Sequence, residues 1–372
     1  MGAEHLHIVC LDAPAPANYG GAIDMFYKVK ALAESGRKIQ LHFFEYKSGR
    51  SAKGLEPYCA SIRAYRRKGP VSSLLQGLPY IVGSRINTDL AEVLNRDGHP
   101  VLLEGIHCAG LLPLLRPGRK LLVRMHNDEA AYYAGLAQNE PALLKRLFFL
   151  RESRQLAKYQ QQLPKDVPLA CVAYNDIEVL RQQYGFTHLP FIPSFTPWQT
   201  LEGSPGRGTY CLYQGNLEVA ENMEAARWLI REVFAFLPLP FVVAGKNIPE
   251  ALVQAGAPFS HIRFVSNPDE AAMELLLREA HINVLPSFNT TGLKLKMLHA
   301  LFAGRHCVAN GAGVAGTAFD SAAEIAETPE AFRACVQALW EIPFTEEIRE
   351  RRRRLADVYN NRKNAEALNA WL

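Results

Sequence analysis

Short apolar runs alternate with stretches of helical spacing along the first half of the chain. The spacing is clearest from Ala22 to Ser35, where apolar residues recur every three or four positions and Gly36 follows as a stop signal. The apolar runs are bounded by turn residues, which is typical of buried parallel strands. This alternation predicts a doubly wound α/β domain. The predicted strands are LHIVCL, IQLHFFEY, CASIRAY, VLLEG, KLLVRM and PLACVAY.

The same alternation starts again after a stretch without any period. Residues 190–208 are dense in proline, glycine, serine and threonine, which is typical of an interdomain linker. We therefore predict an α/β fold of two Rossmann-like domains, at residues 1–195 and 209–349, joined by a linker at 196–208. By analogy, the charged helical stretch at about 350–372 is expected to pack back on the first domain. The strands predicted for the second domain are TYCLYQG, FVVAG, HIRFV, HINVLPS and RHCVAN.

Composition narrows the classes of function. The 372 residues, 48% of them hydrophobic, are enough for two buried cores. The 41 basic and 37 acidic residues nearly balance, so we expect no nucleic-acid partner. The seven cysteines show no CxxC spacing, and Cys10, Cys171, Cys211 and Cys307 lie in apolar runs, so we expect reduced thiols in a cytoplasmic protein. We also expect no signal peptide and no transmembrane helix, because no apolar run is long enough.

Glycines stand where predicted strands end. Gly20 and Gly21 lie at the mouth of a helix, where backbone amides can approach phosphate oxygens. A flexible turn before a helix would have the same sequence, and there is neither a full GxGxxG pattern nor a Walker lysine. Two later strands also end in glycine and polar residues, which would border the same ligand site: Gly215 with Asn216, and Gly245 with Lys246.

The segment PSFNTTGLKLKMLHALFAG carries the most information in the chain. It predicts a strand that ends at Pro286, a polar turn, and an amphipathic helix from about Gly292 to Gly304. Lys294 and Lys296 fall in the first turns, so a diphosphate would meet both the helix dipole and positive charge there. An ordinary helix whose lysines face the solvent is the alternative.

The segment LLVRMHNDEAAYY places several polar side chains directly after a buried strand. These residues are expected at the carboxyl end of the sheet, where open α/β sheets bind ligands. The alternative is a helix start that Asn127 or Asp128 caps. The polar residues are Arg124, His126, Asn127, Asp128 and Glu129.

Two other functional classes find little support. Histidines, cysteines and carboxylates are not clustered at metal-ligand spacing, and there is no GxSxG motif, so we expect neither a metal enzyme nor a serine hydrolase.

The helix predicted around Leu143 to Leu156 is basic on one side and aromatic on the other. It could dock on an anionic membrane or simply pack against the protein.

The order of these motifs resembles the glycosyltransferase family four group of the GT-B fold over nearly the whole chain. PAPANYGGAIDMFYKVKALAESG is similar to that family's Gly-Gly loop and first helix, and RMHNDEAAYYAGLA to its HN-containing segment. YQGNLEVAENMEAARWLI, FVVAGK, HIRFVSNPDE and HINVLPSFNTTGLKLKMLHALFAG follow in the family's order. The resemblance implies two Rossmann-like domains that face each other across a cleft.

The resemblance also implies a retaining transfer from a nucleotide sugar, without a divalent metal or other cofactor. It places Gly20 and Gly21 near the donor phosphates and His126 against the transferred sugar. Lys296 or Lys294 would neutralise the leaving diphosphate. The other donor-side candidates are Gly215, Asn216, Gly245, Lys246, Val265, Ser266, Thr290, Thr291, Gly292, Leu293 and His299, and the acceptor-side candidates are Asn127, Glu129, Glu104 and His107.

The chain departs from the family pattern at two places. The family's paired glutamates fall on Thr291 and His299, so neither carboxylate is present, although a neutral His299 could hydrogen-bond a ribose hydroxyl. A lysine that the family often carries falls on Asn222 or nearby.

The leading hypothesis is a glycosyltransferase of polysaccharide, glycolipid or glycoconjugate biosynthesis. Its partners would be a nucleotide-sugar donor and a sugar, lipid-linked or other hydroxyl acceptor, with peripheral attachment to the inner face of a membrane left open. The second hypothesis is a GT-B scaffold without activity, which the missing glutamates favour. A sugar-nucleotide epimerase ranks last, because only the segment from His126 to Glu129 offers a dense supply of acids and bases.

Overall fold

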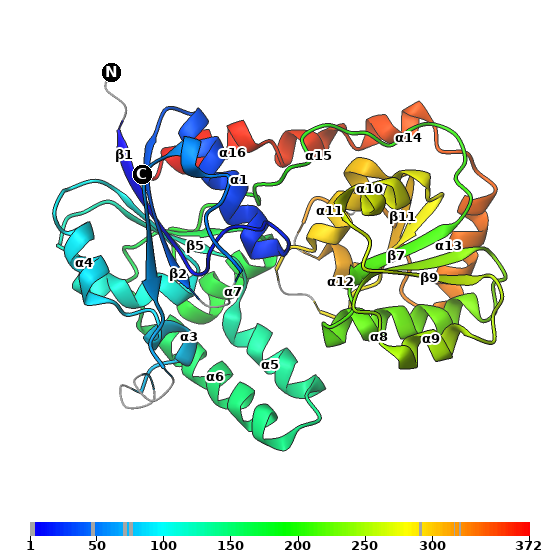
Figure 1. Ribbon diagram of the computed structural model, residues 1–372, viewed down its shortest axis with the longest axis horizontal. Helices are drawn as coiled ribbons and strands as arrows, with labels where there is room; N and C mark the ends of the chain where they lie inside the picture. The colour runs from blue at the N-terminus through cyan, green and yellow to red at the C-terminus, as the bar shows by residue number, and fades with distance from the viewer. Residues whose placement is uncertain are drawn as a thin grey trace. The chain divides into compact units, whose positions relative to one another are not determined.

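The computed structural model describes residues 4–45, 49–69, 73, 77–289, 292–315, 317–319 and 321–372. The chain forms two compact units (Figure 1). One contains Met1–Pro197 and Tyr359–Leu372, and the other contains Trp198–Thr290 and Lys294–Val358.

The first unit is built on a six-stranded parallel sheet in the order β3-β2-β1-β4-β5-β6. Its strands are β1 (His5–Cys10), β2 (Lys38–Glu45), β3 (Cys59–Arg66), β4 (Val101–Glu104), β5 (Leu121–Met125) and β6 (Leu169–Cys171). Its helices are α1 (Gly20–Glu34), α3 (Tyr80–Gly83), α4 (Thr88–Leu94), α5 (Glu129–Asn139), α6 (Leu143–Gln162), α7 (Tyr174–Tyr184) and α16 (Asn361–Asn369), with short 3-10 helices η1 (Glu56–Tyr58) and η2 (Ile106–Leu114).

Both faces of the central strands of this sheet are buried, as expected for a parallel sheet between helices. Successive strand residues point to opposite faces, so Leu102 belongs to one core and Val101 and Leu103 to the other. The first core is covered by α1 and by α16, which lies beside α1 (Figure 1). The arrangement explains why the strand sequences are apolar runs rather than alternating patterns.

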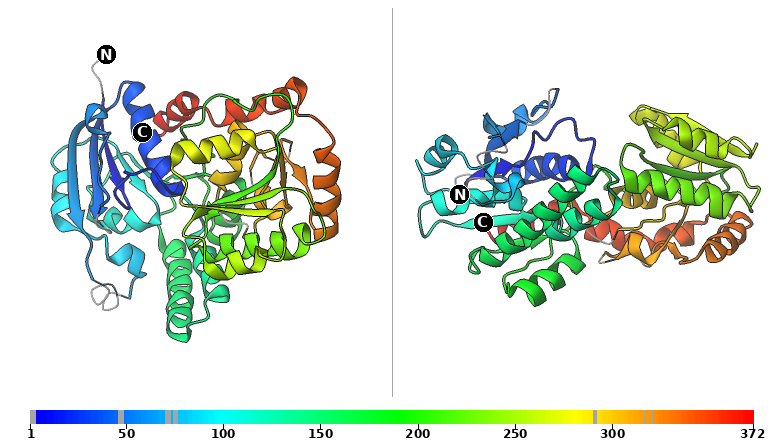
Figure 2. Two further views of the ribbon diagram at one scale, coloured as in Figure 1. Left: turned by 45° about the vertical axis from the view of Figure 1, so that its right-hand side comes forward. Right: turned by 90° about the horizontal axis from the view of Figure 1, so that it is seen from below.

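The second unit repeats the same topology with its own strands. Its parallel sheet has the order β12-β11-β10-β7-β8-β9, so the first and fourth strands of the unit, β7 and β10, are neighbours, as β1 and β4 are in the first sheet. Its elements are β7 (Cys211–Asn216), α8 (Ala220–Trp228), the π-helical turn η3 (Leu229–Phe234), β8 (Phe241–Lys246), α9 (Glu250–Gly256), β9 (Ile262–Ser266), α10 (Glu270–Glu279), β10 (Ile282–Val284), α11 (Leu295–Ala303), β11 (His306–Ala309), α12 (Gly311–Val314), β12 (Glu324–Ile325), α13 (Pro329–Trp340), α14 (Glu346–Arg351) and α15 (Arg353–Val358). Helices α8 and α9 lie on one face of this sheet and α10 and α11 on the other (Figures 1 and 2).

These observations confirm the predicted fold class of two α/β domains with parallel sheets. Each strand order reverses once, between β1 and β4 and between β7 and β10, and open α/β sheets bind ligands at the carboxyl ends of the strands beside such a reversal. Among the described residues, no helix is both long and apolar enough to cross a membrane.

Three local predictions need correction. CASIRAY was predicted as a buried strand, but β3 is an edge strand and most of its residues are partly or fully exposed, because only β2 pairs with it. The helix expected from about Gly292 begins at Leu295, and Lys294 is its N-cap. The helix expected from Ala22 begins two residues earlier, at Gly20, and ends before Gly36 as predicted.

Candidate functional site

A cluster of buried charges lies at the strand-order reversal of the first unit. Helix α1 supplies Asp24 and Lys28, which are four residues apart and therefore share one helix face. Strand β4 ends in Glu104, and β5 carries Arg124. The Lys28 Nζ atom donates to Asp24 Oδ2 at 2.6 Å and to Glu104 Oε2 at 2.9 Å. Buried charges of this kind are tolerated only when they are paired.

Arg124 completes the pairing. Its Nη2 atom lies 3.2 Å from Asp24 Oδ1, and its guanidinium also donates to the carbonyl oxygens of Ile192 and Pro193. Burial by itself raises the pKa of Asp24, but the charges of Arg124 and Lys28 outweigh it and lower the pKa. Two carboxylates therefore face a lysine and an arginine, so the opposite charges of the cluster offset each other.

His126 connects this cluster to the surface. It follows β5 directly, and its Nε2 atom lies 2.9 Å from Glu104 Oε2, while its Nδ1 atom lies 3.8 Å from Asp24 Oδ2. Its side chain is 10% exposed, whereas Glu104 is fully buried. Burial would raise the pKa of Glu104, but Lys28 and the hydrogen bond from His126 lower it. The ionised Glu104 thus fixes the orientation of the His126 ring.

Asp24, Glu104 and His126 also form a set of metal-ligand type. One ligand atom from each lies within 4.8 Å of the others, although the three residues come from distant parts of the chain. The local spacing considered in the sequence could not reveal this set. However, the Lys28 ammonium is bonded to both carboxylates, so a divalent ion would have to displace a buried cation. The set as built fits the lysine better than a metal.

Two acidic residues that follow His126 have different roles: Asp128 caps a helix, and Glu129 is buried. Asp128 is the N-cap of α5, and its Oδ1 accepts from the backbone N–H groups of Ala130 and Ala131, so the capping alternative is correct for this residue. Glu129 is buried and accepts a 3.3 Å hydrogen bond from Asn127 Nδ2. Burial raises the pKa of Glu129 to about 7, against the opposing effect of that hydrogen bond. Its carboxyl group can therefore exchange a proton near neutral pH.

The remaining first-unit candidates lie around the same strand ends. His107 is in η2, and burial together with the charge of Arg85 lowers its pKa well below the usual value, so its ring is neutral. Gly20 and Gly21 form the first turn of α1, whose N-cap, Tyr19, makes no capping hydrogen bond through its side chain. A Cβ atom on Gly21 would lie 3.2 Å from the Tyr19 ring, so that ring would have to shift to accommodate a larger residue.

In the second unit, glycines allow close approach at the ends of β7 and β8. Gly215 and Asn216 end β7, and Gly245 and Lys246 end β8. A Cβ atom on Gly245 would lie 1.9 Å from the carbonyl oxygen of Gly215, so no other residue fits. Val265 and Ser266 end the neighbouring strand β9. All of these donor-side candidates therefore lie at one edge of the second sheet.

Lys296 is a cation that neutral side chains hold at this edge. Its Nζ atom donates to Asn222 Oδ1 at 2.8 Å and to Tyr213 Oη at 3.1 Å. Burial lowers the pKa of Lys296 to about 8; Glu221 opposes this effect and Lys294 adds to it. The resembled family's lysine falls on Asn222 or nearby, and the fold brings a lysine from α11 into contact with Asn222. A pattern read along the sequence could not show this.

His299 is paired with a carboxylate that the sequence did not indicate. Its Nε2 atom lies 2.7 Å from Glu274 Oε2 on α10, and its ring stacks on Trp198 with 4.3 Å between ring centres. The hydrogen bond from His299 lowers the pKa of Glu274. Only the Nδ1 atom of His299 then remains to accept from a hydroxyl. Glu274 gave no signal of its own, because with Arg278 it has the spacing of an ordinary helical surface pair.

A second unpredicted group ties the ends of β10 and β11 to α8. Asn310 exchanges hydrogen bonds with the backbone of Ser287 at 2.9 and 2.7 Å, and Ser287 Oγ donates to Glu221 at 2.8 Å. Gly292, in the loop that follows, has a φ of 65°, which favours glycine. Leu293 precedes the N-cap of α11. Thr290 and Thr291 lie outside the described residues.

Comparisons with known proteins agree with this arrangement. Residues 208–341 match the family "Glycosyl transferases group 1". An "Uncharacterized 44.6 kDa protein in cps region" of Klebsiella pneumoniae is 25% identical over 328 residues, which is 83% of this chain and 84% of that protein. These similarities support a glycosyltransferase.

Two solved structures show the same fold at low identity. Sucrose-phosphate synthase from Thermosynechococcus elongatus is 16% identical, with a TM-score of 0.72 over 99% of this chain and 98% of the other. An alpha,alpha-trehalose-phosphate synthase (UDP-forming) from Burkholderia xenovorans, in complex with glucose-6-phosphate, is 13% identical, with a TM-score of 0.62 over 97% of each chain. At these identities the likeness establishes the GT-B fold alone.

Proposed function

We propose that this protein transfers a sugar from a nucleotide-sugar donor to an acceptor hydroxyl, with retention at the anomeric carbon and without a metal ion. The observation that carries the proposal is the match of residues 208–341, in the second unit, to the group 1 glycosyl transferases. The match covers the strand ends where Gly215, Gly245 and Lys296 lie. We assign nucleotide binding to this edge of the sheet.

In the proposed reaction, the acceptor oxygen bonds to the anomeric carbon as the bond from that carbon to the diphosphate oxygen breaks. The acceptor proton passes to the departing phosphate oxygen. Lys296, with Lys294 beside it in sequence, stabilises the charge that develops on the diphosphate. His126, oriented by Glu104, contacts the transferred sugar, and Glu129 and His107 serve the acceptor. We place the reaction in the cytoplasm, where the seven free cysteines would stay reduced, in the assembly of a polysaccharide, glycolipid or other glycoconjugate.

The first test is a thermal-shift panel of UDP, GDP, ADP and dTDP with their common sugars, in EDTA and then in magnesium. A ligand that binds the folded state raises the apparent Tm by mass action. We expect one nucleotide to shift Tm without metal, and its sugar to release nucleoside diphosphate when an acceptor panel is added. His126→Ala should lower that release about 100-fold or more, as expected for loss of a group that contacts the reacting sugar. No shift and no release with any donor would overturn the proposal.

A scaffold without activity remains the second candidate, because Thr291 and His299 stand where the resembled family has glutamates. It predicts a Tm shift with one nucleotide but no release of nucleoside diphosphate with any acceptor. The Glu274 carboxylate argues for activity, because it lies beside His299 and so supplies a carboxylate near a position where the resembled family has a glutamate.

A further inference from the structure

The hairpin of α5 and α6 projects from the sheet of the first unit (Figures 1 and 2). Eight consecutive residues at the start of α6 and just before it, 141–148, are all exposed. Four of them are large and apolar: Leu143 is 67% exposed, Leu144 83%, Leu147 53% and Phe148 38%. Single exposed leucines are common on proteins, but a contiguous group at the end of a projecting element marks an interaction surface.

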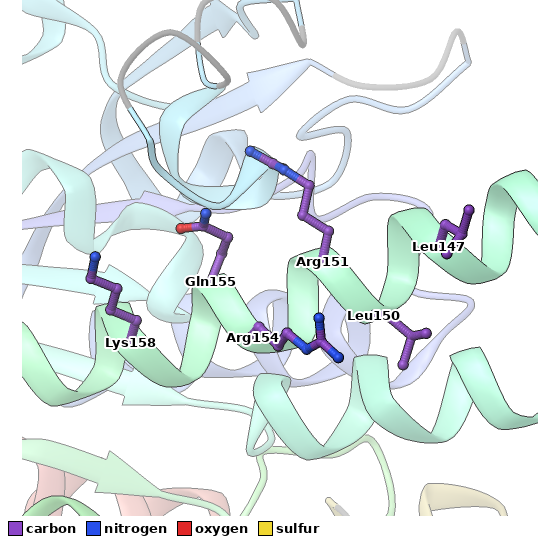
Figure 3. A pocket seen from close by; sticks show the side chains of 6 residues that line it. All are labelled: Leu147, Leu150, Arg151, Arg154, Gln155 and Lys158. Carbon is purple, nitrogen blue, oxygen red and sulfur yellow. The ribbon is translucent and has the colours of Figure 1, made fainter.

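Positive charge follows the apolar group along the same helix. Arg151, Arg154 and Lys158 line a shallow hollow together with Leu147, Leu150 and Gln155, and Figure 3 shows these side chains in a row along α6. Arg151 pairs with Glu152. Within the described part of the chain, Arg154 and Lys158 are exposed and make no ion pair. Residues 140–162 contain five basic and two acidic residues, and one of those acids, Glu152, is buried.

We propose that this hairpin binds the surface of a bilayer rich in anionic phospholipid. Helices that lie at such a surface bury their apolar side chains about 5–10 Å deep and keep lysine and arginine among the headgroups. Leu144 and Arg154 are ten residues apart, which is about 15 Å along a helix. A helix that enters tip first at a tilt therefore buries Leu143, Leu144 and Leu147 while Arg154 and Lys158 reach the phosphates.

The charge distribution favours a lipid surface over a second copy of the chain. Two copies that met through these hairpins would bring two sets of basic side chains together, and few exposed acids are nearby to offset the repulsion. An anionic bilayer complements both the charge and the convex apolar tip. The inference is independent of sugar transfer, since its test needs neither donor nor acceptor.

The test is flotation of the full chain with vesicles of equal phosphatidylglycerol and phosphatidylcholine, beside vesicles of phosphatidylcholine alone. We expect binding to the anionic vesicles at low salt, weaker binding at high salt, and at least about tenfold weaker binding to phosphatidylcholine. The triple variant Leu143→Ser, Leu144→Ser, Leu147→Ser and the double variant Arg154→Glu, Lys158→Glu should each reduce binding about tenfold or more.

Control variants make changes of the same kinds elsewhere in the chain. Arg354→Glu with Arg362→Glu changes the net charge by the same amount on α15 and α16, and Leu275→Ser removes an exposed leucine from α10. Both control variants should bind vesicles as the unaltered chain does. The far-UV circular dichroism spectrum should be the same in all the variants and in the unaltered chain. Equal loss in the controls, or no binding to anionic vesicles, would overturn the proposal. A third result would also overturn the proposal. In that case the chain self-associates and binds no vesicles, and sedimentation velocity shows that the triple leucine variant is monomeric.

Discussion

The two units have the same strand order but place different chemistry where that order reverses. In the first unit the reversal is filled by a closed network of ion pairs around Lys28, and only His126 reaches the surface. In the second unit the neutral partners Tyr213 and Asn222 hold the ammonium group of Lys296 there. The difference teaches that topology decides where the strand ends meet, while a few side chains decide whether that place holds a network of buried ion pairs or a lysine bonded to neutral groups.

The largest expected effect is on the buried ion pairs of the first unit. Lys28→Met removes the cation that Asp24 and Glu104 share and leaves buried carboxylates with too few partners. We expect the free energy of unfolding to fall by about 3–5 kcal/mol, measured by urea denaturation. The control Arg181→Met breaks the exposed pair with Glu178 and should cost at most about 1 kcal/mol. Equal losses would refute the description of the cluster as a buried network.

The next effect is acid sensitivity in the interior of the first sheet. Burial, with a smaller contribution from His7, lowers the pKa of His42 to about 3, against about 6.5 in an unfolded chain. Between these values the unfolded state binds the extra proton, so stability rises with pH in this range and is lost as pH falls from 6.5 toward 3. Because of His42, the free energy of unfolding should fall by about 1.4 kcal/mol for each pH unit between pH 6 and pH 4.

Urea midpoints measured across this pH range check the expectation. His42→Gln should flatten the pH dependence, whatever it does to the absolute stability. Tyr65→Phe removes the hydroxyl 3.3 Å from His42 Nδ1 but no group that titrates in this range, and it should keep the slope. The same slope in His42→Gln as in the unaltered chain would show that another group is responsible.

The third effect tests the proposed role of Lys296 in the second unit. Lys296 is protonated below its pKa of about 8, so the affinity for a nucleoside diphosphate should fall above pH 8 by up to about tenfold per pH unit. Lys296→Arg keeps a charge that does not titrate in this range and should move or abolish this decline. Isothermal titration calorimetry between pH 7 and pH 10 measures it, and an unchanged decline in the arginine variant would assign the effect elsewhere.

The smallest effect concerns the pair on the neighbouring helices. Glu274→Gln keeps the shape of the side chain but removes the charge beside His299, so we expect a stability loss of about 1 kcal/mol, because the pair is only partly buried. Its thermal unfolding should be compared with that of Glu330→Gln, an exposed partner of Arg333. A larger loss from Glu330→Gln would mean that the His299 pair does not stabilise the second unit.

Much of the scaffold follows from local patterns. Eleven of the twelve strands in the described part of the chain were predicted, because most of them bury both faces and are therefore apolar runs bounded by turns. β12 was missed, since Glu324–Ile325 is only two residues long and exposed. The exposure of β3 was also missed, because its residues have the composition of a strand wherever it lies in a sheet, and only the strand order shows that it forms an edge.

The site could be predicted only in part. His126 and Glu129 were predicted from the segment after β5, and Lys296 was predicted from the segment that leads into α11. In both places polar residues follow an apolar strand, which is a pattern that the sequence shows directly. Asp24 and Lys28 gave no such signal, as an i, i+4 pair of opposite charge looks like any solvated helix surface. Glu274 was not predicted for the same reason, because with Arg278 it forms an i, i+4 pair of opposite charge.

The sequence by itself determined that the chain forms two parallel-sheet units and where the carboxyl ends of their strands fall, because the periods of strands and helices are local properties of the chain. Only the tertiary structure decided that Lys28 lies between Asp24 and Glu104, and that Lys296 is bonded to Asn222 and His299 to Glu274. All of these contacts except the one between Lys28 and Asp24, which are both on α1, join residues from different elements. A charge becomes a buried partner rather than a solvated surface group only when packing excludes water from both members, and no local pattern records that exclusion.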